Sequence, residues 1–408
     1  MSGLFWPGDQ RAGGTFGDAA LVAAMTAVES AWWQALVAQG IAPGAGGDDP
    51  IAGSPPPTAA ELAGLAEVAE AGGNPVIGFV AWLRDRVRAR DPGAARWLHR
   101  GLTSQDVLDT GLMLLARELA ADLGAAVDRQ VAALAALADE HRATPMLGRT
   151  LTQPAVPITF GGKVATWLDG LLDAAAGLDA LSFPAQFGGA AGNRSGATAL
   201  GADPAKLAAA AAGRLGLAER GPWHTNRSPV TRLGDALTGC TAAWGRIAND
   251  VLTLSRPEIG ELTEPAAPGR GGSSAMPQKI NPVLSVLLRR AALAAPAYAS
   301  VLHLAAADTG DERPAGAWHL EWEPLRLLAR HTRTAAGQAT ELIEGVGVHA
   351  RRMAATLDAH REDVAAEARS LARLAGRSGA DTYGPETSGA DDALVAAAVA
   401  RGRARLGT

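Results

Sequence analysis

One apolar repeat constrains the fold of this chain more than any other feature of its sequence. Its members follow one another at alternating intervals of three and four positions: Val230, Leu233, Leu237, Cys240, Trp244, Ile247, Val251 and Leu254. A helix with this spacing carries one continuous apolar seam, which is buried only against partner helices that run nearly parallel to it. The repeat therefore predicts a bundle of long helices.

The rest of the chain supplies more helices and few strand signals. Apolar periodicity between glycine and proline breaks predicts helices over 18–39, 157–180, 282–307, 318–345 and 390–404. Two further helices are predicted from signals at their N-termini. Thr58 and Glu61 form a capping box at one, and Asn74 followed by a proline marks the start of the other. Aromatic residues make up only 4% of the chain. We predict an all-α fold with an elongated central bundle.

The lengths of these helices suggest three domains. Shorter helices occupy 1–103, very long ones occupy 104–345, and 346–408 form a small C-terminal helical domain. Helices as long as those of the central segment leave apolar faces that one chain does not cover. We therefore expect the central bundle to form the core of an oligomer.

Charge and cysteine content exclude several classes of function. A formal net charge of -5 provides no basic field for nucleic acid or for an anionic membrane surface. One cysteine, Cys240, cannot form an internal disulfide or a cysteine-based metal cluster. We find no signal peptide and no charge-free apolar run of the roughly 18 residues that a membrane span needs. These features predict a cytoplasmic enzyme whose partners are neither nucleic acid nor membrane.

A glycine-rich loop that begins near residue 268 is the strongest candidate for chemistry. Three of the four residues 269–272 are glycines, which make the loop mobile, and two prolines stiffen the turn after them. Its candidate site residues are Ser273, Ser274, Met276, Lys279 and Asn281. Lys279 is one of only three lysines in the chain, and a plain linker has no use for it. We interpret the loop as a lid that carries reactive groups.

A second candidate site precedes the helix that begins near residue 104. Thr103 or Ser104 can cap this helix, so its free N–H groups and its dipole face any anion in front of it. His99 and Arg100 lie just upstream. We interpret the segment as a cradle for a carboxylate.

Other candidates are less specific. Arg149 and Gln153 are equally compatible with substrate binding and with a structural role at a helix turn. His224 and His319 each follow a tryptophan, which lowers the local polarity and favours a neutral imidazole. We interpret both as site residues and the other histidines apart from His99 as structural. Neither a metal-ligand cluster nor a phosphate loop is visible, so we predict no metal and no cofactor.

Three of these segments resemble the signatures of the fumarase/aspartase superfamily, whose members break or form a bond β to a carboxylate. They are the lid 268–282, the segment 99–106 and the segment 148–157. The chain most resembles the 3-carboxy-cis,cis-muconate cycloisomerase branch, through Asn74-Pro75 and through the strings 186–192, 222–227 and 318–323.

The resemblance implies a three-domain fold, a homotetramer whose active sites are shared between subunits, and cofactor-free lactonisation of a polycarboxylate in aromatic catabolism by the protocatechuate pathway. Ser274 would transfer a proton at the carbon α to a carboxylate, assisted by Lys279 and His224. The residues that would bind substrate are His99, Arg100, Thr103, Ser104, Arg149, Gln153, Ser273, Met276, Asn281, Arg313 and His319.

Several positions depart from the pattern of the branch. Leu151 stands where many members carry a catalytic histidine, and Gln278 and Ile280 stand where a histidine and an arginine are usual in the lid. The C-terminal domain is also shortened before Tyr383. A lyase that eliminates a group from a substituted succinate, of specialised metabolism or of the adenylosuccinate or argininosuccinate type, is therefore an alternative. A non-catalytic structural homologue is a second one, against which the intact Ser274 and Lys279 argue.

Overall fold

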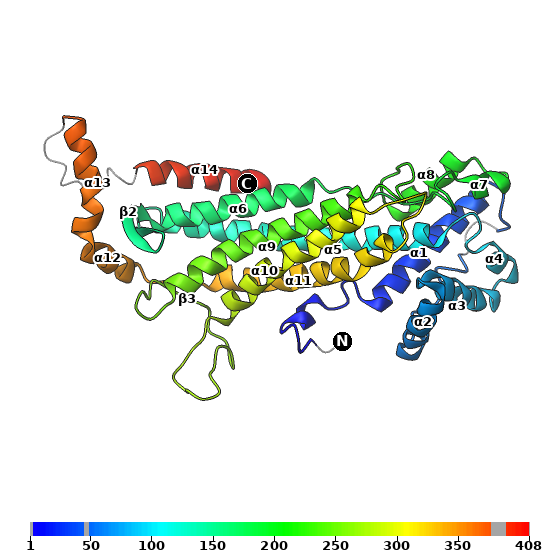
Figure 1. Cartoon of the computed structure of the whole chain (residues 1–408), viewed down its shortest axis with the longest axis horizontal. Helices are drawn as coiled ribbons and strands as arrows, with labels where there is room; N and C mark the ends of the chain where they lie inside the picture. Colours follow the sequence, from blue (N-terminus) through cyan, green and yellow to red (C-terminus); the bar gives the residue numbers. More distant parts are fainter. Residues whose placement is uncertain (1–2, 45–48, 377–388, 408) are drawn as a thin grey trace.

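The computed structural model describes residues 3–44, 49–376 and 389–407. Long helices lie side by side along the molecule and form its central bundle: α5 (Ser104–Glu140), α6 (Phe160–Asp179), α9 (Ser228–Leu254), α10 (Val283–Ala307) and α11 (Ala317–Gly345) (Figure 1). The described residues contain only two short two-stranded sheets, a β-hairpin and a pair of two-residue strands that lie far apart in the sequence. The prediction of an all-α fold with an elongated bundle is confirmed.

The heptad seam accounts for the packing of this bundle. All eight seam residues are buried on α9, which packs against α6, α10 and α11. Gly245 allows the close approach of α10, since a Cβ added there would lie 2.4 Å from the Cβ of Ala292. Trp244 donates from its indole nitrogen to Oε1 of Gln130 on α5, at 2.7 Å, so the one polar atom of this seam residue is paired inside the bundle.

Shorter helices gather at one end of the bundle. α1 (Asp18–Ala38) packs against α5 and α8 (Pro204–Leu215), while α2 (Ala59–Gly72), α3 (Val76–Arg88), α4 (Pro92–Trp97) and α7 (Ser195–Ala199) complete this end (Figure 1). α1 is long and apolar enough to cross a membrane, but 61% of its apolar window is buried within the protein. Its apolar residues are thus accounted for by the core.

Two start signals read from the sequence lie at helix starts: the first has the expected geometry, and the second is displaced by one residue, because Pro75 rather than Asn74 is the N-cap of α3 (Val76–Arg88). Thr58 and Glu61 form the capping box that begins α2. The side chain of Asn74 accepts the N–H of Val76 at 3.0 Å, so α3 starts beside it.

A β-hairpin occupies the opposite end, where the sequence predicted only helices and a helix turn. β1 (Pro145–Thr150) pairs with β2 (Gln153–Thr159), and α6 begins at Phe160 rather than at 157. Leu151 and Thr152 make the turn with φ of 48° and 71°. Two-residue hairpin turns of this kind normally require asparagine or glycine. The sequence therefore carries no turn signal at this point.

The C-terminal helices separate into two groups. The short pair β3 (Leu262–Thr263) and β4 (Gly347–Val348) leads into α12 (Ala350–Ala359) and α13 (Arg361–Leu374), which pack on β1 and β2. α14 (Gly389–Leu406) instead lies along α5 and α6, with Val395, Ala398 and Val399 buried. The expected loose stretch and the shortening before Tyr383 lie outside the described residues, and the three domain boundaries stay a prediction.

Candidate functional site

Asp106, in the first turn of α5, organises the best-defined polar cluster of the chain. Its buried carboxylate accepts the N–H of Thr103 at 2.9 Å and the N–H groups of Gly188 and Gly189 at 2.8 and 2.9 Å. It also lies 2.9 Å from Nε2 of His224. One carboxylate thus fixes the start of α5, a glycine turn and the histidine relative to one another.

His224 keeps one ring nitrogen available. If Nε2 donates to Asp106, the neutral ring presents Nδ1 as an acceptor. Nδ1 is buried and has no hydrogen-bond partner among the described residues. It faces the glycine turn, since a Cβ at Gly192 would lie 3.6 Å from it. The histidine can therefore accept a proton only from a group that reaches this turn.

A buried arginine at the N-cap of α9, Arg227, faces the next turn of α5, which carries Asp109. Arg227 donates to the carboxylates of Asp109, at 2.7 and 3.1 Å, and of Glu321, at 2.6 to 3.2 Å. Burial works against its charge, but the two carboxylates raise the pKa of Arg227 above its usual value. Trp318 also donates to Asp109, at 2.9 Å. This ion cluster holds α5, α9 and α11 together beneath the site.

Asp106, Asp109, Arg227 and Glu321 were not among the site residues predicted from the sequence. Asp106, Arg227 and Glu321 lie within strings that were singled out for their resemblance, and Asp109 lies three residues beyond the first of these strings. Arg227 directly precedes the heptad helix. The missing information was the pairing of charges far apart in the chain, which one sequence does not contain.

Arg313 brings a positive charge to the start of α5. Its Nη2 donates to Oγ1 of Thr103 and, at 3.3 Å, to the carbonyl oxygen of Ala190. The first N–H groups of a helix lack intrahelical acceptors, and the helix dipole adds partial positive charge there. Thr103, Ser104 and Arg313 therefore lie together in an arrangement suited to a carboxylate.

The other candidates near this end are held by neighbouring residues. His99, at φ 63°, places its Nδ1 2.6 Å from Oε1 of the buried Glu29. Arg100 is exposed and donates from its Nε to the carbonyl of Arg96. His319 is exposed and contacts Trp318 edge-to-face and Trp322 at a tilt, with ring centroids 5.2 and 4.9 Å away.

His319 also lies close to the start of α3. A Cβ at Gly73 would be 4.0 Å from its Nε2. Gly73, which precedes Asn74, therefore faces an imidazole supplied by α11.

The hairpin residues lie at the far end of the molecule. Arg149 donates to Glu261 at 2.9 and 3.2 Å, and this carboxylate is buried. The arginine is therefore engaged in a structural ion pair on β1. Gln153 is exposed beside the turn, and the tip residue Leu151 is 96% exposed. A helix turn at these residues, one of the two roles that the sequence left open, is wrong because they form a hairpin.

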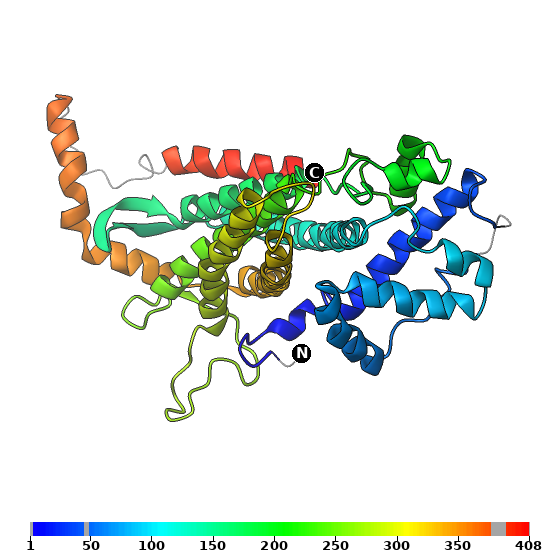
Figure 2. The ribbon, with the colours of Figure 1, turned by 45° about the vertical axis from the view of Figure 1, so that its right-hand side comes forward.

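The lid projects away from the bundle beside β3, ahead of α10 (Figure 2). Ser274, Met276 and Lys279 are exposed, and Ser273 accepts the N–H of Met276 at 3.1 Å. Asn281 donates from its backbone and from its side chain to the carbonyl of Gly271, at 2.8 and 3.0 Å. Its amide thus closes the base of the loop.

One chain does not bring its three candidate segments together. α5 has 37 residues. At ~1.5 Å per residue it separates Thr103 from the hairpin end by about 55 Å. The lid also lies away from the Thr103 end, as both ribbon views show (Figures 1 and 2).

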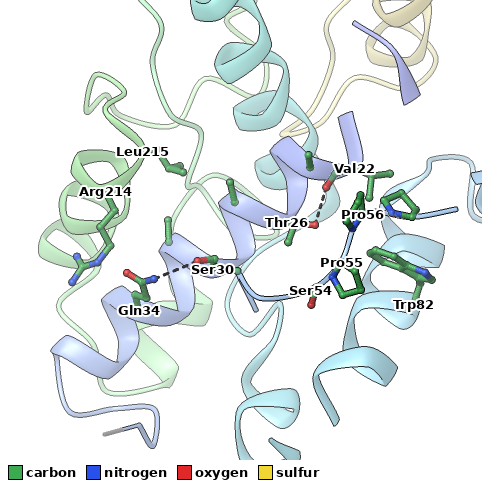
Figure 3. Close-up of a pocket in the computed structure, with 15 residues that line it drawn as sticks. Val22, Thr26, Ser30, Gln34, Ser54, Pro55, Pro56, Trp82, Arg214 and Leu215 are labelled. Carbon is green, nitrogen blue, oxygen red and sulfur yellow. Dashed lines mark hydrogen bonds between the residues drawn. The ribbon is translucent and has the colours of Figure 1, made fainter. Parts of the chain in front are cut away.

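A separate groove lies among α1, the loop 52–57, α3 and α8 (Figure 3). It has a volume of about 430 Å³ and contains Pro55, Trp82 and Arg214 but none of the candidate residues. Thr26 and Gln34 on its wall already form hydrogen bonds within α1. We assign it no function. Within the part of the chain that the structure describes, no group of three possible metal ligands occurs.

Comparison with known proteins defines the class to which this fold and these segments belong. Residues 69–296 match the model of a family described as lyase. The chain belongs to this lyase family, within the fumarase/aspartase superfamily, as the resemblance predicted.

Individual relatives with different named activities are similar to this chain over most of its length. The chain is 46% identical over 349 residues to nitrosuccinate lyase of Streptomyces davaonensis, covering 84% of this chain and 73% of that one. It is 42% identical over 322 residues to 3-carboxy-cis,cis-muconate cycloisomerase of Pseudomonas aeruginosa, covering 78% and 69%. The crystal structure of 3-carboxy-cis,cis-muconate lactonizing enzyme from Pseudomonas putida superposes with a TM-score of 0.83 at 30% identity, over 96% of each chain.

Proposed function

We propose that the protein is a cofactor-free lyase that transfers a proton at the carbon α to a carboxylate of a small polycarboxylate. The observation that carries this proposal is the pairing of Arg313 with Thr103 at the start of α5, in a chain whose lid exposes Ser274 and Lys279. The first pair suits the carboxylate of a substrate, and the second supplies a hydroxyl and a cation for proton transfer.

The proposed site needs more than one chain. Val286, Leu293 and Leu304 on α10 are 51, 72 and 64% exposed, so the bundle offers apolar surface to further copies. A homotetramer could place the lid and the hairpin of two chains at the α5 terminus of a third. We also propose that it acts in the cytoplasm.

In the proposed reaction, Ser274 exchanges a proton with the carbon α to one carboxylate. A serine hydroxyl ionises far above neutral pH, so its alkoxide needs the charge of Lys279 and the N–H groups of the lid. Thr103, Ser104 and Arg313 hold the carboxylate, and each charge-assisted hydrogen bond contributes roughly 1.5 to 3 kcal/mol. His224 is the second candidate for proton exchange, through Nδ1.

Leu151, at the tip of the β1–β2 hairpin, favours a substrate whose leaving group departs as a weak base. Leu151 cannot give a proton to a departing atom, whereas an amine leaves readily only when it is protonated. Nitrite and carboxylate leave as anions. This chemistry, together with the relative at 46% identity, favours elimination from a nitro-substituted succinate.

In that elimination Ser274 takes the proton, the electron pair of the C–H bond forms the double bond, and the C–N bond breaks with release of nitrite. Lactonisation of 3-carboxy-cis,cis-muconate is the second candidate, supported by the relatives at 42% identity and by the structural match. In lactonisation a carboxylate of the substrate forms the new C–O bond. This reaction has no leaving group to protonate, so it also needs no acid at Leu151.

The test is turnover by the purified protein of nitrosuccinate, 3-carboxy-cis,cis-muconate, adenylosuccinate and argininosuccinate. Nitrite is measured colorimetrically and the changes in conjugation by absorbance, with Ser274→Ala as the control for adventitious activity. We expect turnover of nitrosuccinate or of the muconate. Turnover of adenylosuccinate or argininosuccinate alone would contradict the inference from Leu151. Inactivity on all four would favour the non-catalytic homologue.

A further inference from the structure

The lid is attached to the protein through a narrow neck. Glu264 accepts the N–H groups of Leu284 and Ser285 at 3.0 and 2.6 Å, which fixes the start of α10. On the other side Gly271, at φ 75°, lies so close that a Cβ would come within 2.6 Å of the carbonyl oxygen of Asn281. The close approach of Gly271 to Asn281 closes the neck. Ser274 and Lys279 both lie in the loop between these two residues.

Arg270, which precedes Gly271, joins the neck to α11 of the bundle through an ion pair. Its Nη2 donates to Oε1 of Glu341 on α11, and its Nη1 donates to the carbonyl of Pro265 at 3.2 Å. The side chain of Arg270 is 17% exposed. The position of the lid is therefore set by where α11 presents Glu341.

Glu341 is held at the same time by the N-terminal segment of the chain. Its Oε2 accepts a hydrogen bond from Nη2 of Arg11 at 2.8 Å, and Arg11 belongs to the 3-10 helix η1 (Asp9–Ala12). Partial burial works to raise the pKa of Glu341, but the bonds from Arg270 and Arg11 lower it below its usual value. The carboxylate thus stays charged and holds both arginines.

The N-terminal segment has its own firm attachment to the bundle. Trp6 stacks on His331 with centroids 3.4 Å apart, and the guanidinium of Arg290 lies over the indole ring, 3.7 Å from its centroid. Asp9 forms an ion pair with Arg330 at 2.7 Å. η1 is therefore a fixed support from which Arg11 can hold Glu341.

We propose that Glu341 is a positioning residue of the lid, and that the N-terminal segment holds the lid neck through the chain of contacts from Arg11 to Glu341 to Arg270. This inference rests on the proposed function where it concerns turnover, because Ser274 lies four residues beyond Arg270. The proposal gives the N-terminal segment, which contains none of the reactive groups, a role in the reaction.

The first experiment compares Glu341→Gln with Glu344→Gln in the full-length protein. Glutamine keeps the shape but only one acceptor oxygen, so it can hold one arginine and not both. Glu344 is the matched control, since it lies on α11 one turn away and pairs with Arg129 at 2.8 Å. Amide hydrogen exchange is measured for the peptides covering 264–282, together with the melting temperature.

We expect faster exchange across 264–282 in Glu341→Gln and in Arg11→Gln, and wild-type exchange in Glu344→Gln, at similar melting temperatures. On a substrate that turns over, Glu341→Gln should lower kcat about tenfold, equivalent to about 1.4 kcal/mol, with partial rescue by Glu341→Asp. Arg11→Gln should lower it about threefold, as befits an exposed ion pair. The double variant should lose less than the product of the single losses.

The two readouts separate the two proposals. Faster exchange in the lid of a protein that turns over none of the four substrates would support the coupling and count against the proposed function. Exchange in Glu341→Gln equal to that in Glu344→Gln would overturn the coupling, whatever the substrate. Altered exchange with unchanged kcat in an active enzyme would overturn the positioning role.

Discussion

Replacement of Asp106 by asparagine tests the interpretation that one carboxylate organises the end of α5. The carboxylate faces four donors: Nε2 of His224 and the N–H groups of Thr103, Gly188 and Gly189. Asparagine is almost isosteric, but one of its two terminal groups is itself a donor. With Nε2 of His224 as a donor, each carboxylate oxygen serves two donors, so two of the four lose their acceptor in either amide orientation.

The structure gives the size of the expected effect. Hydrogen bonds to a charged group contribute roughly 1.5 to 3 kcal/mol each, so two lost bonds lower the free energy of unfolding by about 3 to 6 kcal/mol. The Asp106 side chain is fully buried and His224 is 3% exposed, so solvent has little access to replace the lost acceptors. Such a loss is a large part of the roughly 5 to 15 kcal/mol that stabilises a typical domain.

Denaturant unfolding at fixed protein concentration measures this loss, with Asp235→Asn as the control. Asp235 is exposed and pairs with His303 at the surface, at 2.9 Å, so its replacement should leave the midpoint almost unchanged. A midpoint for Asp106→Asn within error of the wild type would refute the reasoning. It would show that the four contacts do not depend on the negative charge.

Three further predictions concern the lid, the N-terminal segment and the separation of the candidate segments. Ser274→Ala should lower kcat by roughly 10² to 10⁴ with little change in KM, and Ser273→Ala should cost less, in steady-state assays of whichever substrate turns over; near-normal kcat in Ser274→Ala would place the proton donor elsewhere. Burial lowers the pKa of His331 to about 4 from 6.5, so the unfolded chain binds more protons between these values and stability should fall as pH drops from 6.5 towards 4. His331→Phe should reduce that loss in melting curves against pH, and an unchanged slope would contradict the assignment. Mixed Ser274→Ala and Arg313→Met chains, co-refolded, should be more active than either variant alone, because some sites would combine intact segments; no gain, or a monomer by sedimentation, would exclude shared sites.

The sequence alone determined the class of the fold and the location of the lid. The heptad seam is a property of neighbouring residues on one helix, so its period revealed α9 and required partner helices. The start signals at Thr58 and Asn74 are equally local, since a cap involves residues two or three positions apart. The lid at 268–282 was recognisable because its glycines, hydroxyls and lysine are contiguous. The resemblance to the superfamily depended on such short strings, and the relatives confirm it.

Only the tertiary structure decided which polar groups meet. Arg227 pairs with Asp109 and Glu321, which lie 118 and 94 positions away in the chain. The turn at Leu151 also escaped prediction, because its residues do not favour a positive φ and the pairing of β1 with β2 imposes it. Periodicity and caps follow from the geometry of a few bonded neighbours, whereas the partner of a buried charge depends on how separate helices pack. One sequence contains the first kind of information, and only the folded chain contains the second.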